Sequence, residues 1–235
     1  MSYQDGFEPR LSANYLLNNN SSLKLGFNRN YQYIHLLTSA TSSSPLDTWI
    51  MSGENIKPQI ADQISLGYFR NFGGKAFESS VEVYYKDMQN VIDYRTGANV
   101  FFNDEVEADL LSGDGESYGA EFYIKKNTGK LTGWLSYTLS WTNRKFDEIN
   151  NGQNFPARQD RRHDISLVTI YKINENLTFS GNFSYYTGDA VTFPAGQYQL
   201  EGSSVPMFTR RNGNRTPAFH RMDVGLTWNR PKKGK

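Results

Sequence analysis

Short and long polar connections alternate along this chain, and they join segments whose side chains switch between apolar and polar. Residues 133–141 show the pattern best. Leu135, Tyr137, Leu139 and Trp141 fall on one side, and the residues between them, mostly Ser and Thr, fall on the other. Side chains of a β-strand point alternately to opposite faces of the sheet. The period of two therefore predicts strands rather than helices.

The same period predicts about nine strands, which cover residues 9–17, 22–32, 62–70, 76–94, 117–126, 133–146, 161–172, 177–187 and 217–229. Every second connection is a turn of a few residues. The others are long polar loops at 33–61, 95–116, 147–160 and 188–216. Outer-membrane β-barrels have short turns on one side of the bilayer and long loops on the other. The spacing therefore favours an all-β, antiparallel transmembrane β-barrel.

One face of these strands is expected to contact lipid. Tyr and Trp residues gather near the strand ends, where the aromatic girdles of a membrane protein lie. A soluble all-β sandwich would show the same alternation, but its loops do not sort by length into two sides. The residues predicted to face lipid are Leu66, Val81, Val83, Leu135, Tyr137, Leu139, Leu167, Phe179, Phe183, Val224 and Leu226.

Composition narrows the function classes. The 235 residues include 25 Lys and Arg against 24 Asp and Glu, so bulk charge gives no reason to expect nucleic-acid binding. Aromatic residues reach 14 %, which suits interfacial girdles. The sequence contains no cysteine, which excludes disulfides and thiolate metal sites. It contains no apolar run of the roughly 18 residues that a transmembrane helix needs.

The strand count predicts a slice of a larger barrel. Bacterial single-chain barrels have an even number of strands, whereas this chain has an odd number. No charged segment followed by an apolar one comes after Met1, so no signal peptide is recognised. Two unpaired sheet edges inside a bilayer are too costly, because their N–H and C=O groups would lack partners. We therefore expect residues 1–235 to be one partial barrel domain that needs further strands.

Several segments resemble the C-terminal part of the β-barrel of TonB-dependent outer-membrane receptors of the Bacteroidetes type. They are FEPRLS (7–12), YQYIHLL (31–37), IKPQIADQ (56–63), VYYKDMQNVIDY (83–94), SYGAE (117–121), KNTGKLTGW (126–134), DRRHD (160–164) and PAFHRMD (217–223). Their order and spacing, which span nearly the whole chain, make the resemblance fairly specific.

The resemblance implies a 22-stranded barrel in a Gram-negative outer membrane, plugged by an N-terminal domain. Such receptors import scarce nutrients (iron chelates, glycans, peptides or cofactors) with energy from the TonB complex. The plug, the TonB-contact segment, the signal peptide and about two terminal strands are expected outside this sequence. The implied partners are outer-membrane lipid, the plug, the remaining strands, the TonB complex and a small-molecule or oligomeric nutrient.

Candidate ligand-binding residues lie in the long loops. Guanidinium groups suit an anionic substrate or lipid phosphates, and an aromatic ring can stack on a sugar. Ordinary solvated loops would contain the same residue types. The candidates are Trp49, Arg158, Arg161, Arg162, Arg210, Arg211 and Arg215.

No catalytic, metal or cofactor site is predicted. The acidic residues of loop 95–116 (Asp104, Glu105, Glu107, Asp109, Asp114 and Glu116) match no compact calcium loop. His35, His163 and His220 have neither zinc-site nor catalytic-triad spacing. We therefore expect transport rather than an enzyme. The alternatives are an outer-membrane barrel enzyme, an autonomous porin and a soluble glycan-binding β protein.

Overall fold

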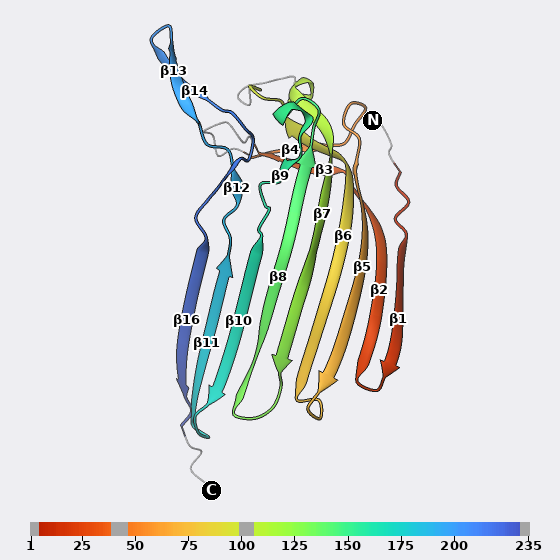
Figure 1. Ribbon diagram of the computed structural model, residues 1–235, viewed down its shortest axis with the longest axis vertical. Coiled ribbons are helices and arrows are strands. Elements are labelled where there is room, and N and C mark those ends of the chain that lie inside the picture. Colours follow the sequence, from red (N-terminus) through yellow and green to blue (C-terminus); the bar gives the residue numbers. More distant parts are fainter. Residues whose placement is uncertain (1–4, 39–46, 99–105, 231–235) are drawn as a thin grey trace.

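The computed structural model describes residues 5–38, 47–98 and 106–230, and it consists mainly of one antiparallel sheet (Figure 1). Nine strands follow one another across this sheet. They are β1 (Arg10–Asn18), β2 (Ser21–Gln32), β5 (Gln59–Phe72), β6 (Phe77–Tyr94), β7 (Leu110–Lys126), β8 (Leu131–Lys145), β10 (His163–Lys172), β11 (Leu177–Tyr186) and β16 (Phe219–Trp228). All nine predicted strands are confirmed, and chain neighbours are sheet neighbours throughout.

The short connections all lie at one end of the sheet and the long ones at the other (Figure 1). At the turn end, Gly73 and Gly74 have φ of 62° and 65°, as expected of glycines in a tight turn. The Asn174 side chain accepts the backbone N–H of Asn176 at 2.9 Å, which closes another turn. The predicted sorting of short turns to one end of the sheet and long loops to the other is therefore confirmed. We call these two ends the turn end and the loop end.

The long connections contain small elements that the period-two pattern did not predict. Four of them form two hairpins, β3–β4 and β13–β14, and the others are three short strands and two 3-10 turns. The elements are β3 (Ile34–Thr38), β4 (Asp47–Met51), β9 (Phe155–Pro156), β12 (Ala190–Val191), β13 (Gly196–Leu200), β14 (Ser203–Met207), β15 (Asn214–Arg215) and the 3-10 turns Val106–Asp109 and Asn150–Gly152. Among the residues described, no helix is long and apolar enough to cross a membrane.

Two predicted boundaries are wrong. β7 begins at Leu110 rather than near residue 117, so Asp114 and Glu116 belong to a strand and not to a loop. This part of β7 pairs with the end of β6 beyond a bulge at Asn90, where φ is 57°. It stands beyond the apolar band, so no alternation marks it. Conversely, Arg161 and Arg162 precede β10, which begins at His163. Asp104 and Glu105 lie outside the described residues.

In the part of the chain that the structure describes, no second layer covers the sheet and no hydrophobic core lies along its length. Val83 is 47 % exposed and Leu135 is 39 % exposed, and Leu139 is half-buried. The only hydrophobic core cluster among the described residues lies at the loop end. A soluble two-layer sandwich would bury these side chains between its sheets, so the structure favours the barrel-wall prediction.

Candidate functional site

One face of the sheet forms a continuous apolar band. Residues that face each other across an antiparallel pair share a face, and the ladder joins Leu25, Leu66, Val83, Ala120 and Leu139 in one row. Other rows join the remaining candidates on this face, which we call the outward face. All the residues predicted to face lipid lie on it: Leu66, Val81, Val83, Leu135, Tyr137, Leu139, Leu167, Phe179, Phe183, Val224 and Leu226.

Aromatic residues mark both edges of the band. Towards the loop end, Tyr85, Tyr118 and Trp141 stack in a row across β6, β7 and β8, with centroid separations of 6.5 and 5.3 Å. Towards the turn end, Phe72 and Phe77 stack at 4.9 Å. Aromatic girdles at two levels flank the apolar band of a membrane barrel.

The band ends abruptly beyond the aromatic row. The next outward row towards the loop end consists of Arg29, Asp62, Asp87, Glu116 and Asn143. Arg29 and Asp62 form a two-pronged ion pair, with N–O distances of 2.7 and 2.6 Å. A change from apolar to charged within one row is expected where hydrocarbon gives way to a polar boundary.

The band also reveals the strand tilt. Its last apolar residue towards the loop end is Phe27 on β2 and Met222 on β16. Following the register partners from Met222 across seven strand pairs leads to Ser21 on β2. Ser21 lies six residues closer to the turn end than Phe27. A slip of about one residue per strand corresponds to a tilt of roughly 30–35°. This is close to the tilt of roughly 35–45° that is usual in outer-membrane barrels.

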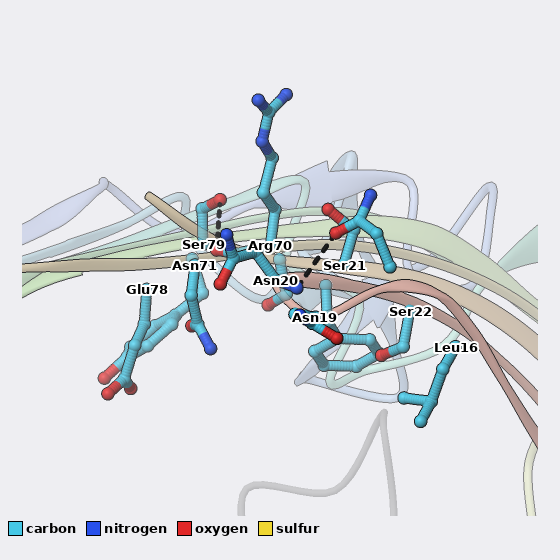
Figure 2. A pocket seen from close by; sticks show the side chains of 13 residues that line it. Leu16, Asn19, Asn20, Ser21, Ser22, Arg70, Asn71, Glu78 and Ser79 are labelled. Atoms are coloured by element: carbon cyan, nitrogen blue, oxygen red, sulfur yellow. Dashed lines mark hydrogen bonds between the residues drawn. The ribbon is translucent and has the colours of Figure 1, made fainter. Parts of the chain in front are cut away.

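The opposite face, the inner face, is polar and is lined by many short side chains. One row contains Ser80, Tyr123, Ser136, Ser166 and Ser184. Near the turn end this face has a hollow of about 320 Å³, lined by residues including Ser22, Asn71, Glu78 and Tyr123. The close view shows the Arg70 side chain pointing away from most of the others (Figure 2).

Two carboxylates oppose each other on the inner face. Glu82 on β6 pairs in register with Glu121 on β7. Among the described residues, neither forms an ion pair. Like charges directly opposite each other destabilise a sheet. This pair therefore concentrates negative charge at one place on the inner face.

At the loop end, the ends of β6 and β7 and the connection between β8 and β10 pack around a small core, and we call this region the loop cap. Its core contains Val91, Leu111, Phe146, Ile149 and Phe155, all almost fully buried. The cap lies over the inner face. A Cβ on Gly113 would come within 2.6 Å of the Phe146 ring, and one on Gly115 within 3.1 Å of Met88. Both glycines share the face of Glu121, because β7 alternates without interruption there.

Arg211 ties the last long loop to this cap. Arg211 is only 5 % exposed. Its Nη1 donates to Asp93 Oδ1 at 2.9 Å and to the Tyr94 carbonyl oxygen at 2.7 Å. The Asn150 side chain bonds both the N–H and the C=O of Arg211. Arg211 therefore joins connections that lie more than a hundred residues apart in sequence.

Asp160 accepts hydrogen bonds from two more of the candidate arginines. It is 1 % exposed and accepts the Thr142 N–H at 2.7 Å. Arg215 donates to both its carboxylate and its carbonyl, and Arg162 donates to the carboxylate at 3.4 Å. Arg161 instead donates to Asp189 at 2.8 Å, which raises the pKa of Arg161, and lies 4.0 Å over the Tyr186 ring.

The other candidates are open to the surroundings. Arg158 and Arg210 are exposed, and the only hydrogen bond of the Arg210 side chain within the described chain is a 3.4 Å contact to the Asn154 carbonyl. Trp49 is 67 % exposed on the β3–β4 hairpin. The opposite face of that hairpin buries His35, whose Nε2 lies 3.0 Å from Ser52 Oγ. Burial lowers the pKa of His35.

Sequence reasoning grouped the arginines but missed their partners. Asp93, Asn150 and Asp160 position them, and Asp93 and Asn150 gave no signal in the sequence because they act on a distant segment. The charged run at 160–162 was the one local signal. His163 bonds the Tyr137 hydroxyl at 2.9 Å on the outward face. Within residues 5–38, 47–98 and 106–230, no cluster of His, Cys, Asp and Glu is arranged to hold a metal ion.

Comparison with known proteins agrees with this geometry. The family model for the TonB-dependent receptor-like β-barrel matches residues 1–234. A search of curated protein sequences finds no match. Among solved structures, the ferric-catecholate import receptor Fiu of E. coli K12 aligns with a TM-score of 0.62 at 15 % identity, over 95 % of this chain and 28 % of that one.

Two other structures give similar values. The ferripyoverdine receptor of Pseudomonas aeruginosa has a TM-score of 0.62 at 14 % identity, over 93 % of this chain and 26 % of its own. The FrpB iron transporter of Neisseria meningitidis has 0.57 at 14 %, over 94 % and 32 %. The chain thus spans less than a third of the length of each of these proteins. It belongs to the TonB-dependent receptor β-barrel family, whose members lie in the outer membrane of Gram-negative bacteria.

Proposed function

We propose that this chain forms part of the wall and mouth of a nutrient importer that binds an anionic nutrient at its loop end. The observation that carries the proposal is the loop cap. It lies over the polar face of the sheet and leaves the guanidinium groups of Arg158 and Arg210 exposed. Guanidinium groups favour anions. An iron chelate with net negative charge suits these arginines better than a neutral glycan. Peptides and cofactors that carry negative charge suit them as well.

Of the remaining candidate residues, some hold the loops in place and others are available to contact the ligand. Arg211 and Arg215 are engaged with acceptors of the chain, so they hold the loops in place. Trp49 is the exposed ring available to stack on a planar part of the ligand. The proposed transport mechanism is binding followed by movement of the plug, without covalent chemistry.

The outward band is proposed to contact lipid and the inner face to contact the plug. The band supplies an apolar surface between two aromatic levels. Glu82 and Glu121 would be neutralised by Lys or Arg side chains of the plug. The edges at β1 and β16, which each pair with one strand here, would pair with the remaining strands. Energy would come from the TonB complex through the N-terminal region of the full receptor.

Ligand binding by the purified full-length receptor tests the proposal. We expect a ferric tris-catecholate, which is anionic, to bind and an uncharged malto-oligosaccharide not to bind. The double substitution Arg158→Gln and Arg210→Gln should weaken chelate binding on the order of 100-fold, because each of the two charge-assisted contacts contributes on the order of 1.5 kcal/mol. Binding of the oligosaccharide alone would contradict an anionic ligand, and unchanged chelate binding by the double variant would contradict the role of Arg158 and Arg210.

A further inference from the structure

Two cations lie on the outward face near the turn end. β5 pairs without interruption from Leu66 to Arg70, so the Arg70 side chain shares the face of the apolar band. The same holds on β7 from Ala120 to Lys126. Figure 2 shows Arg70 pointing away from residues of the inner hollow such as Glu78. The register and the picture therefore both place Arg70 on the face that is proposed to contact lipid.

The strand tilt brings these two cations to one depth. On β7 the register leads from Arg70 to Ile124. A level plane through the apolar band shifts towards the turn end by about one residue per strand in the direction from β2 to β16. On β7 that plane passes close to Lys126, nearer the turn end than Ile124. The Phe77 ring, on the strand between the two cations, stacks on Phe72. We call Arg70, Phe72, Phe77 and Lys126 the basic girdle.

The basic girdle has no acidic partner in the part of the chain that the structure describes. Arg70 is exposed, and neither Arg70 nor Lys126 takes part in an ion pair or a side-chain hydrogen bond there. The Lys126 Nζ atom lies 5.8 Å from the centre of the Phe77 ring. Glu78 lies on the inner face, where it accepts a hydrogen bond from Asn127. The girdle therefore presents two uncompensated positive charges on the outward face.

The depth and the charge of the basic girdle point to one partner. The girdle lies where the apolar band ends, which is the depth of lipid headgroups. Basic side chains at that depth attract anionic lipids, and a guanidinium forms charge-assisted hydrogen bonds with a phosphate. The acyl chains of the same lipid can lie along exposed band residues such as Leu66 and Val83. At the loop end the charged outward row instead includes Asp62, Asp87 and Glu116, so an anionic headgroup suits the turn end.

We propose that Arg70 and Lys126 form a binding site for the headgroup phosphate of an anionic glycerophospholipid in the leaflet at the turn end. The rings of Phe72 and Phe77 would pack beside its glycerol and the first carbons of its acyl chains. This inference rests on the proposed lipid contact of the outward band. It adds a preference for lipid charge, which apolar contact alone does not provide. The site uses neither the loop arginines nor the inner face, so it is independent of the nutrient.

Native mass spectrometry of the delipidated full-length receptor in detergent tests the site. The probes are phosphatidylglycerol, phosphatidylcholine with the same acyl chains, and inorganic phosphate. We expect the receptor to retain phosphatidylglycerol preferentially. Arg70→Gln should lower that preference about fivefold, and the double variant with Lys126→Gln on the order of 30-fold, because each basic residue adds a similar attraction to an anionic headgroup. Arg70→Lys should lose less, because it keeps the charge but not the planar group.

The matched control removes the same two charges from the inner face, through Arg221→Gln and Lys125→Gln. Lys125 is the chain neighbour of Lys126 but points the other way, so this control should leave the lipid preference unchanged. Circular dichroism must show the same β content in every variant. Where the double variant of Arg70 and Lys126 lacks it, the two single variants provide the comparison.

Three outcomes would overturn the site: equal retention of the two lipids by the unaltered receptor, an unchanged preference in Arg70→Gln, or an equal loss in the inner-face control. Inorganic phosphate retained as tightly as phosphatidylglycerol would overturn the lipid as its source. Retention of neither lipid would count against the proposed lipid contact of the whole band as well as against the site.

Discussion

The wall and the loop cap treat apolar side chains in opposite ways. On the wall, Leu226 is 65 % exposed and packs into no second layer. In the cap, Phe155 is 1 % exposed within a cluster of five hydrophobic residues. A wall of this kind is stable only if its surroundings are apolar, whereas the cap forms a water-excluding core of its own. The two regions therefore depend on different solvents, although β6, β7 and β8 run from one into the other.

The cap and the wall also differ in where their ion pairs lie: the cap buries one, whereas the outward face of the wall keeps its pair more exposed. The cap contains the Arg211–Asp93 ion pair, with side chains 4 % and 11 % exposed. The outward face of the wall has its ion pair, Arg29–Asp62, only beyond the aromatic row, and that pair is more exposed. Buried pairs are costly to break, since the remaining charge stays uncompensated. Substitutions should therefore act locally, each according to the surroundings of its own region.

Removing the buried cation should have the largest effect. Arg211→Met leaves Asp93 without its partner, and we expect the opening free energy of the cap to fall by about 3–5 kcal/mol. Hydrogen exchange of the amides around Phe146 and Asn150 measures it. The double variant with Asp93→Asn should recover part of the loss. Uniform loss of protection along the whole wall would show that cap and wall are not separate regions.

The same truncation in each region compares them directly. Phe155→Ala should destabilise the cap by about 3–4 kcal/mol, because it opens a cavity in a closed core. Phe179→Ala, on the outward face and 37 % exposed, should cost the wall less. Hydrogen exchange of the cap and urea unfolding in lipid vesicles give the two values. A larger cost at Phe179 would mean that the wall packs against protein instead of lipid.

A charge on the band tests which solvent the wall needs. Leu135→Arg should lower the stability of the full-length barrel in vesicles by about 2–4 kcal/mol, the usual cost of a cation near the bilayer midplane. Its neighbour Ser136 points to the inner face, so Ser136→Arg is the matched control and should cost much less. Unfolding titrations in vesicles provide the comparison. Equal costs on both faces would contradict the assignment of the outward face.

These contrasts also explain what the sequence could predict. An apolar face opposite a polar face imposes the period of two, so the strands and outward residues such as Val83 and Leu135 followed from the pattern. Beyond the aromatic row that constraint ends, and the extension of β7 to Leu110 left no alternation to read. The links of the cap join residues far apart in sequence, as Arg211 joins Asp93. Such pairs arise from the folded arrangement and leave no local pattern.

The smallest expected effect concerns pH and the β3–β4 hairpin. Burial of His35 lowers its pKa below the usual 6.5, so the folded hairpin favours the neutral ring. The stability that this provides is present above the unfolded pKa and declines as the pH falls below about 6.5. Hydrogen exchange of Leu36 and Ile50 should therefore show weaker protection, after correction for intrinsic rates, at pH 5 than at pH 7.5. His35→Gln should remove that pH dependence. If the variant keeps it, another titrating group controls the hairpin; protection in the wall, which lies outside the reach of His35, should stay constant throughout.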